Sequence, residues 1–342
     1  MTRRKTRVDL AEHLASVSPA SGKSKDVARL IAAVGRAATV LQGHLRRAAI
    51  DGHLGYAGGR NSTGDSQKKL DLLGNETVVE AFARTGLVAA IISEELEQPK
   101  ILSRKHTARY VLCTDPLDGS SNTDINGPVG TIFGIYRSGS MLPEPLHVAQ
   151  LELLAGGYVL YGPSTVLVYA TEAEVTGFTF DAQRGSFVLT HPKLRCPTQG
   201  PYYSANLGNS DCWPANVRKF VEYLAASNCE RPSSRHHPYS LRYSGALVAD
   251  VHRTILEGGL YFYPPDDKHP EGKLRLLYEC KPLAFVAERA GGRASTGKQP
   301  VLTVPPESAH QRTPFAIGSR AEVELYEQFV AQGSQLDSDV RA

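Results

Sequence analysis

Two carboxylates, Asp115 and Asp118, stand three residues apart, and small polar residues follow them directly. Carboxylate oxygens are hard ligands that suit Mg²⁺ or Mn²⁺. Gly119, Ser120 and Ser121 can turn backbone N–H groups and hydroxyls toward a phosphate held by such a metal. A plain turn with a helix cap is the alternative, because Asp-Pro, Asp-Gly and Ser-Ser-Asn are common in turns.

A second acidic pair favours the metal site. Glu94 and Glu95 follow the apolar run 87–92, which predicts a buried strand. Two adjacent carboxylates at the end of such a strand are costly unless a positive charge compensates for them. A Glu-Glu pair elsewhere is usually a solvated helix start, so its position after the apolar run matters.

Two more acidic segments remain ambiguous when considered alone. Glu279 lies in the segment 272–280, where we expect it to end an apolar strand, and a structural salt bridge is the alternative for this acid. Asp65 and Asp71 lie in the polar stretch 61–71. For that stretch a surface loop is the favoured interpretation from its own residues.

With these motifs in view, the chain resembles class I fructose-1,6-bisphosphatases, almost continuously from about residue 61 to 319. The resemblance is carried by Glu94-Glu95 and by the segments 115–122, 129–135, 155–164, 239–243, 248–254, 258–264, 273–279 and 310–314, in the same order. It implies an α/β fold of the layered αβαβα sugar-phosphatase type, with mixed sheets sandwiched between helices and the site between two halves.

The resemblance also implies a metal centre with two or more Mg²⁺ per subunit, Mn²⁺ being the alternative metal. The implied ligands are the side chains of Glu94, Asp115, Asp118 and Glu279 and the backbone carbonyl of Leu117. Glu95 and Asp71 are expected to help bind a further metal and to prepare the attacking water. Asp65 is expected on a mobile loop that closes over the metals.

Substrate residues follow from the same resemblance. Asp118, Gly119, Ser120 and Ser121 are expected to hold the leaving phosphate, and Asn206, Tyr239, Tyr243, Tyr263 and Lys273 the sugar and its other phosphate. Arg242 is expected to reach that phosphate from a neighbouring subunit of a homotetramer. Arg can grip phosphate in a bidentate way and Lys supplies a compact charge. For each Tyr alone, a core aromatic with a satisfied hydroxyl is the favoured interpretation, and the resemblance is what makes it a substrate residue.

The implied activity is hydrolysis of the 1-phosphate of D-fructose 1,6-bisphosphate by direct attack of water, without a phosphoenzyme, in gluconeogenesis or a Calvin-type cycle. Many family members carry Tyr where this chain has Asn209. Sedoheptulose-1,7-bisphosphatase or dual-specificity activity is therefore the alternative. A remote alternative is an inactive regulatory protein on the same fold, which predicts a broken metal site, but every acidic ligand position is filled here.

An effector site is also predicted. Arg109, Tyr110 and Arg137 match the cationic and aromatic part of the site at which animal members of the family bind AMP. The segment 21–24 could hold the phosphate of AMP or another anionic effector at a helix start, or it could be an ordinary helix cap. The redox insertion typical of chloroplast members is absent, so no thioredoxin switch is predicted.

Composition restricts the protein class. With 342 residues, the chain exceeds the usual size of a single core, and 38 basic against 35 acidic residues give no nucleic-acid signature. Five scattered cysteines without a Cys-x-x-Cys pair predict reduced thiols and a cytoplasmic location. The sequence has no apolar span of 18 residues, so no membrane helix is predicted. Its basic start lacks the apolar region of a secretory signal.

The elements that must position these residues form two parts, 1–195 and 196–333, followed by a tail at 334–342 predicted to be disordered. The first part opens with an amphipathic helix at 26–49 and continues with strands at 111–113, 131–136 and 166–169 and an antiparallel pair at 178–180 and 186–189. A polar, Pro-containing segment at 192–200 is predicted to link the parts. Helices at 212–226 and 245–256 and a strand at 260–263 are expected in the second part.

Overall fold

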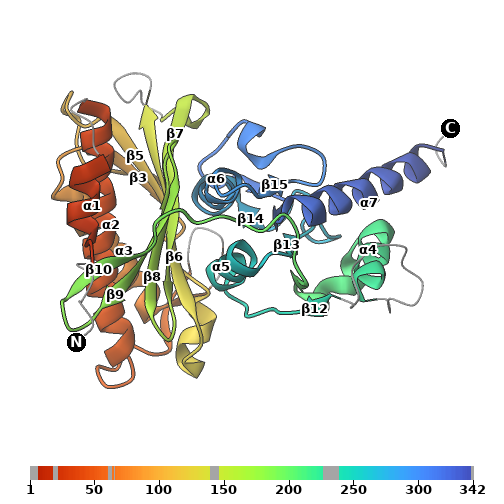
Figure 1. Ribbon diagram of the computed structural model, residues 1–342, viewed down its shortest axis with the longest axis horizontal. Coiled ribbons are helices and arrows are strands. Elements are labelled where there is room, and N and C mark those ends of the chain that lie inside the picture. Colours follow the sequence, from red (N-terminus) through yellow and green to blue (C-terminus); the bar gives the residue numbers. More distant parts are fainter. Residues whose placement is uncertain are drawn as a thin grey trace, which may run out of the picture.

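The structure is a computed structural model, and it describes residues 7–17, 22–60, 64, 66–138, 146–225 and 239–339. Its elements stack in the order helix, sheet, helix, sheet, helix (Figure 1). The α/β layering that the resemblance implies is therefore present. The middle helical layer touches both sheets, and so it joins the two halves of the chain.

An eight-stranded mixed sheet dominates the N-terminal half, in the order β10-β9-β8-β7-β6-β5-β3-β4. Its strands are β3 (Val88–Ser93), β4 (Lys100–Ile101), β5 (Tyr110–Asp118), β6 (Val129–Ser138), β7 (Leu151–Tyr161), β8 (Thr165–Ala170), β9 (Val175–Asp181) and β10 (Ser186–His191). β3 and β5 are parallel, which brings the residues that follow β3 beside the end of β5. β9 and β10 pair antiparallel, with Phe187 opposite Phe180, as predicted.

Helices α1 (Leu10–Val17), α2 (Gly22–Arg47) and α3 (Lys69–Ala83) cover one face of this sheet. The predicted amphipathic helix corresponds to α2, whose apolar stripe includes Leu30, Ile31 and Val34. Neighbouring residues of β6 serve opposite faces, since Phe133 packs under α2 and Ile132 packs in the second core. This period of two explains why the central strands are apolar throughout.

Helices α5 (Leu247–Glu257) and α6 (Lys281–Arg289) form the middle layer. They pack on β6 and β7 on one side and on β17 and β15 on the other. α5 corresponds to the helix predicted at 245–256. Its residues Val248, Val251 and Ile255 are fully buried between the sheets.

The smaller sheet has the order β12-β11-β13-β17-β15. Its strands are β11 (Tyr202–Ser204), β12 (Ser240–Leu241), β13 (Leu260–Tyr263), β15 (Arg293–Ser295) and β17 (Phe315–Gly318), and β13 has the bounds predicted for it. The outer helices α4 (Ala215–Ala225) and α7 (Arg320–Asp339) close the stack over an aromatic core that contains Phe220, Phe262 and Tyr326.

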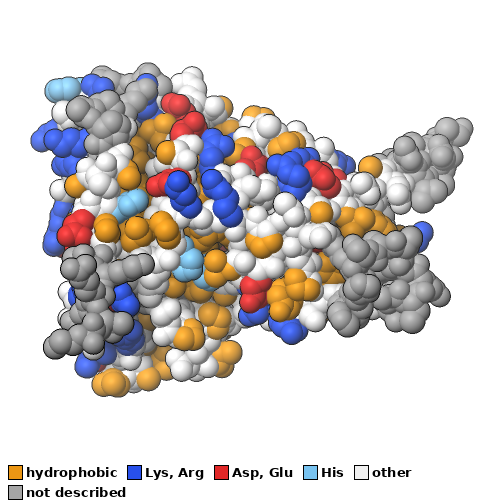
Figure 2. All heavy atoms as spheres, viewed as in Figure 1, with side chains coloured by type: hydrophobic (Ala, Val, Ile, Leu, Met, Phe, Trp, Pro, Cys, Tyr) orange, Lys and Arg blue, Asp and Glu red, His pale blue; other side chains and the backbone are white. Residues whose placement is uncertain are grey.

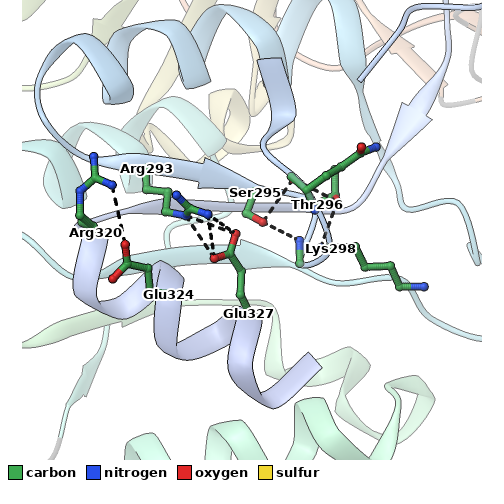
Figure 3. A network of polar contacts seen from close by, with 9 residues as sticks. Arg293, Ser295, Thr296, Lys298, Arg320, Glu324 and Glu327 are labelled. Carbon is green, nitrogen blue, oxygen red and sulfur yellow. Dashed lines mark hydrogen bonds and ion pairs between the residues drawn. The ribbon is translucent and has the colours of Figure 1, made fainter. Parts of the chain in front are cut away.

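A polar network fixes α7 against β15 (Figure 3). Arg293 on β15 donates from Nε and Nη2 to the carboxylate of Glu327 on α7, at 3.2 and 3.0 Å. Arg320 pairs with Glu324 one turn earlier on the same helix, at 3.7 Å. The bidentate pair is partly buried, so it orients α7 more firmly than an exposed ion pair would.

The remaining elements are short. They are the hairpin β1 (Tyr56–Arg60) and β2 (Ser66–Lys68), the pair β14 (Leu274–Arg275) and β16 (Arg312–Thr313), and the helical turns η1 (Ser120–Ile125), η2 (Val148–Gln150), η3 (Leu207–Cys212), η5 (Leu276–Cys280) and η6 (Val301–Thr303). Residues 192–200, which are predicted to link the two parts, contain no helix or strand. None of the described helices combines the length and apolar character that a transmembrane span requires.

Two expectations differ from the structure. The segment 272–280 is not an apolar strand, because only Leu274–Arg275 is extended and Glu279 lies in the π-type helical turn η5. Leu276, Leu277 and Tyr278 are consecutive and all buried, so the segment has no period-two pattern. The next helix, α6, begins at Lys281 and has Pro282 in its first turn. At the C-terminal end of the chain, α7 continues to Asp339, into the tail predicted to be disordered. The Gly in this stretch does not end the helix, because one Gly in a helix costs only about 1 kcal/mol.

Candidate active site

Carboxylates from three segments gather where the two halves meet. Asp115 and Asp118 lie at the end of β5, and Glu94 and Glu95 lie in the turn that follows the neighbouring parallel strand β3. Glu279 comes from η5 in the C-terminal half. These carboxylates influence one another. The pKa of Asp115 is raised well above its usual range, mainly by burial and then by the charges of Glu94, Asp118 and Glu279.

The other two buried acids behave alike. Burial, opposed by the N–H groups of Val248 and Leu247, raises the pKa of Asp118 to about 7. Burial and the charge of Glu94 raise the pKa of Glu279 to about 8, against the opposing charge of Arg275. Several like charges buried together are unfavourable unless cations compensate for them, so the cluster is suited to bind them.

The donor chemistry of this cluster fits a hard divalent metal, because its members are carboxylates. Within the described residues, however, no three His, Cys, Asp or Glu side chains are arranged as a metal-ligand shell. Two of the carboxylates are turned to backbone donors instead. Glu279 Oε2 accepts from the N–H of Arg275 at 2.5 Å, and both oxygens of Asp118 accept from the start of α5.

The first turn of α5 contributes the positive end of a helix to the site. Leu247 N donates to Asp118 Oδ1 at 3.1 Å and Val248 N donates to Asp118 Oδ2 at 2.7 Å. The N-terminus of a helix carries unpaired N–H groups and a partial positive charge, so it stabilises an anion there. Asp118 therefore binds the two halves together in addition to its predicted metal role.

The small residues after Asp118 hold their loop close to α5. Gly119 has φ +72°, and a Cβ at this position would lie 2.5 Å from the Cβ of Ala246, so no other residue fits without movement. Asn122 donates from Nδ2 to the carbonyls of Pro128 and Ser244, both at 3.0 Å. Ser120 and Ser121 begin the helical turn η1 and remain only half-buried or exposed, as a phosphate-binding turn requires.

Asp71 is buried in the first turn of α3, and this position excludes the surface-loop interpretation for it. Its Oδ2 accepts from Lys68 N at 2.7 Å, whereas Oδ1 makes no hydrogen bond to another described residue. Burial raises the pKa of Asp71, opposed by the Lys68 N–H and by the nearby Ser120 hydroxyl. Asp71 thus faces the loop that follows Asp118. Asp65 lies outside the described residues.

Lys68 is a site residue that sequence reasoning missed. Its side chain is buried, and Nζ lies 2.7 Å from Asp124 Oδ2 and 3.4 Å from the carbonyl of Ser121. It therefore connects the start of α3 to the loop expected to hold phosphate. The signal available in the sequence was a Lys three residues before Asp71, which also fits a capping turn.

Two polar contacts support the Glu94-Glu95 turn. Gln67 Nε2 donates to Glu95 Oε2 at 2.6 Å, which joins the hairpin β1–β2 to this turn. Ser93 Oγ donates to Asn75 Oδ1 at 2.8 Å, which joins the turn to α3. Neither Gln67 nor Asn75 carries a motif that would have singled it out.

A second group of predicted residues gathers around Tyr263. Asn209 Nδ2 lies 3.2 Å from the Tyr263 hydroxyl, and Lys273 Nζ lies 5.9 Å from the centre of the Tyr263 ring. Burial, followed by Tyr263, Asp250 and Asp118, raises the pKa of Tyr243 to about 12. Tyr243 therefore lies near both Tyr263 and the carboxylates of Asp250 and Asp118.

The other predicted sugar-binding residues lie apart from this group or are otherwise engaged. Arg242 is exposed and its guanidinium lies 5.5 Å from the ring centre of Tyr202. Asn206 caps η3 by accepting from Gly208 N at 3.2 Å. Tyr239 is buried in the aromatic core, where its hydroxyl donates to Glu322 Oε1 at 2.9 Å, so the structure gives Tyr239 a packing role.

The predicted effector residues meet on paired strands. Tyr110 at the start of β5 stands opposite Arg137 on β6, and Arg109 precedes it. The Tyr110 hydroxyl donates to Asp26 Oδ2 of α2 at 3.2 Å. The face of the molecule in Figure 2 carries interspersed basic and acidic side chains.

Comparison with known proteins identifies the family of this chain. Two family models match, the Fructose-1-6-bisphosphatase N-terminal domain over residues 12–192 and its C-terminal domain over residues 196–331. Fructose-1,6-bisphosphatase class 1 2 of Acaryochloris marina is 52% identical over 313 residues, which is 90% of this chain and 92% of that protein.

Solved structures give the same result. The fructose-1,6-bisphosphatase of Leishmania major in its holo form is 36% identical, with a TM-score of 0.86 over 95% of this chain and 99% of that one. The same Leishmania major enzyme in its T-state is 34% identical, with a TM-score of 0.84 and the same coverage of both chains.

Proposed function

This chain belongs to the fructose-1,6-bisphosphatase family, and we propose that it hydrolyses the 1-phosphate of D-fructose 1,6-bisphosphate to fructose 6-phosphate and phosphate. It is an enzyme of the phosphatase class. The observation that carries the proposal is the buried group of carboxylates from both halves beside the glycine–serine loop and the start of α5.

We propose two or more Mg²⁺ per subunit, with Mn²⁺ as the alternative. The side chains of Glu94, Asp115, Asp118 and Glu279 and the carbonyl of Leu117 would hold them, helped by Glu95 and Asp71. When bound, divalent cations supply positive charge that neutralises phosphoryl oxygens and stabilises the leaving oxygen. The backbone donors that Asp118 and Glu279 now use would then compete with the metal for these carboxylates.

The chain's own groups divide the remaining work. The N–H groups and hydroxyls of residues 119–121 bind the oxygens of the departing phosphate, close to the positive end of α5. Asp71 and Glu95 orient the attacking water. Asp71 Oδ1 is suited to accept a proton from it, because Lys68 N engages only Oδ2 and burial has raised the pKa of Asp71. No nucleophilic role is proposed for Cys113, because its thiol is fully buried in β5 and burial raises its pKa.

At the other end, Tyr263 and Lys273 support the second phosphate and Tyr243 the sugar between the phosphates. Asn209 fixes the Tyr263 hydroxyl, and it is shorter than the Tyr of many family members. This difference is the reason to test sedoheptulose 1,7-bisphosphate as a second substrate. Arg242, exposed beside Tyr202, is suited to reach the second phosphate of a neighbouring subunit in a homotetramer.

The first experiment is phosphate release from fructose 1,6-bisphosphate with Mg²⁺, repeated with EDTA and with sedoheptulose 1,7-bisphosphate. We expect release from the fructose substrate that EDTA abolishes. The ratio of the two rates then assigns the preferred sugar. Folded protein that releases phosphate from neither sugar with Mg²⁺ or Mn²⁺ would contradict the proposal and favour a regulatory role on the same fold.

An anionic effector such as AMP is proposed for the surface around Arg109, Tyr110 and Arg137. The proximity of these three residues supports this site. Asp26, which accepts a hydrogen bond from the Tyr110 hydroxyl, would have to move when the effector binds. Titration of the activity with AMP tests this, and Arg137→Ala should abolish any inhibition without changing the uninhibited rate.

A cytoplasmic location and the gluconeogenic or Calvin-type pathway are proposed from the family and the reduced cysteines.

A further inference from the structure

His310 lies between two segments that carry predicted metal ligands, one from each half. It contacts the turn 94–97 after β3 and the turn η5 that contains Glu279. We propose that His310 is a positioning residue that sets the spacing between Glu94-Glu95 and Glu279. This inference rests on the proposed function, because it assumes that these carboxylates bind metal.

The contacts of the imidazole determine its tautomer. His310 Nε2 lies 3.2 Å from the carbonyl oxygen of Glu97, and a carbonyl can only accept, so Nε2 carries the hydrogen. Nδ1 lies 3.0 Å from the Tyr278 hydroxyl and therefore accepts from it. Burial lowers the pKa of His310, which agrees with a neutral ring. The chain Tyr278 to His310 to Glu97 is thus a directed pair of hydrogen bonds across the interface between the halves.

On one side this pair holds η5. Tyr278 is fully buried and directly precedes Glu279, so its hydroxyl fixes the rotation of the turn that presents the carboxylate. Tyr136 on β6 holds the same turn from a second direction, donating to the Leu277 carbonyl at 2.8 Å. A π-type turn is rare and needs external support of this kind. Such turns are often found at functional sites.

On the other side the pair holds the Glu94-Glu95 turn. Glu94 N donates to Thr114 O at 3.2 Å and Leu96 N donates to Ser93 O at 3.2 Å, so the turn is tight. A displacement of the Glu97 carbonyl is therefore transmitted to Glu94 and Glu95. His310 thus acts on the ligands of both halves through Glu97 and Tyr278, as residues that orient metal ligands do.

The chain contains a matched pair far from these ligands in sequence. Tyr158 on β7 and His252 on α5 have their hydroxyl and Nδ1 2.8 Å apart, with ring centroids at 5.7 Å and an interplanar angle of 76°. The corresponding values for Tyr278 and His310 are 3.0 Å, 5.8 Å and 71°. Both tyrosines are fully buried. Removing either hydroxyl thus has a similar cost for stability, but only Tyr278 directly precedes a predicted metal ligand in the chain.

The test measures Mn²⁺ binding directly, by electron paramagnetic resonance of free Mn²⁺, in wild type, Tyr278→Phe, His310→Ala and the control Tyr158→Phe. We expect Tyr278→Phe and His310→Ala to raise the Mn²⁺ Kd about ten-fold, in the range of outer-shell substitutions. Tyr158→Phe should lower the Tm as much as Tyr278→Phe does and leave the Kd unchanged. His310→Gln, which keeps a donor for Glu97, should recover part of the loss.

Two results would overturn the proposal. One is a wild-type Kd in folded Tyr278→Phe, and the other is an equal change of Kd in Tyr158→Phe and Tyr278→Phe, which would indicate a general loss of stability. If His310→Ala does not fold, Tyr278→Phe decides, because it removes one oxygen atom only. Wild type that binds no Mn²⁺ would instead contradict the metal site of the proposed function.

Discussion

The carboxylate of Asp118 accepts a 2.7 Å hydrogen bond from the backbone N–H of Val248, although 129 residues separate them in the chain. This contact brings the end of a strand in one half against the start of a helix in the other. A predicted metal ligand therefore lies at the positive end of α5. The loop proposed to bind phosphate begins at the next residue, Gly119, so the contact sets where that loop lies.

Replacement of Asp118 by Ala should abolish turnover. It removes a predicted metal ligand and the acceptor for two N–H groups of α5, so we expect phosphate release to fall about a hundred-fold or more. Glu257→Gln, at the exposed end of the same helix, is the control and should keep wild-type activity. A folded, active Asp118→Ala enzyme would show that the metal assignment is wrong.

Arg242→Ala should raise KM about ten-fold and change kcat little. The side chain is exposed and is proposed to bind the phosphate that does not react, so we expect it to contribute binding that is equal in the ground and transition states. Steady-state kinetics on fructose 1,6-bisphosphate measures both constants. Arg253→Ala, another exposed arginine, serves as the control. An unchanged KM for Arg242→Ala would contradict its placement at the second phosphate.

Two glycines with similar backbone angles should respond very differently to substitution. Gly272 has φ +87° and a Cβ there would lie 2.3 Å from Pro314 N, whereas Gly291 has φ +92° and open space around it. Gly291→Ala should lower the free energy of unfolding by about 1 kcal/mol, the cost of a left-handed backbone. Gly272→Ala adds the steric clash, for a loss of about 3 kcal/mol.

Urea denaturation of both glycine variants measures these losses. Because Gly272 directly precedes Lys273, Gly272→Ala should also raise KM, which Gly291→Ala should not. Equal losses of stability in the two variants would mean that the loop at Gly272 relaxes freely around a side chain.

His252 should make stability depend on pH. Burial, and then the charge of His191, lowers the pKa of His252 to about 4 from an unfolded value of 6.5. The unfolded chain therefore binds more protons between these values, and the free energy of unfolding rises with pH across this window. The stabilisation is complete above about pH 7 and is lost as the pH falls toward 4, with an upper bound of about 3 kcal/mol.

Urea denaturation between pH 4.5 and about pH 7 tests the His252 prediction. His252→Gln keeps a polar group for the Tyr158 hydroxyl and cannot titrate, so its stability should rise less steeply with pH than that of wild type. Parallel curves for the two proteins would place the pH dependence in other groups.

The sequence was informative where chemistry depends on neighbouring residues. Asp115 and Asp118 at a strand end, with Gly119 and two serines after them, could be predicted because strand, turn and site are continuous in the chain. The parallel pairing of β3 with β5 explains why Glu94 could be added, since both strands are apolar and end in acids. The layered architecture came from the family resemblance and not from periodicity.

What could not be predicted depends on contacts between distant segments. Lys68 became a site residue only through Asp124 and Ser121, and nothing in its own segment distinguishes it from a solvated lysine. Tyr239 occurs in a motif of the family, yet its hydroxyl is bound to Glu322 of α7, 83 residues later. Glu279 lies in a π-type turn because of Tyr136 and Tyr278, whose contacts leave no periodic signal.

The chain passes between the two halves once, through residues 192–200, and yet both halves contribute carboxylates to one site. The covalent link therefore acts as a tether that supplies a high effective concentration of one half for the other. A protease cut within this segment would turn assembly of the site from a unimolecular into a bimolecular reaction. The activity of the nicked protein would then fall on dilution. This dependence could not be detected in either half alone.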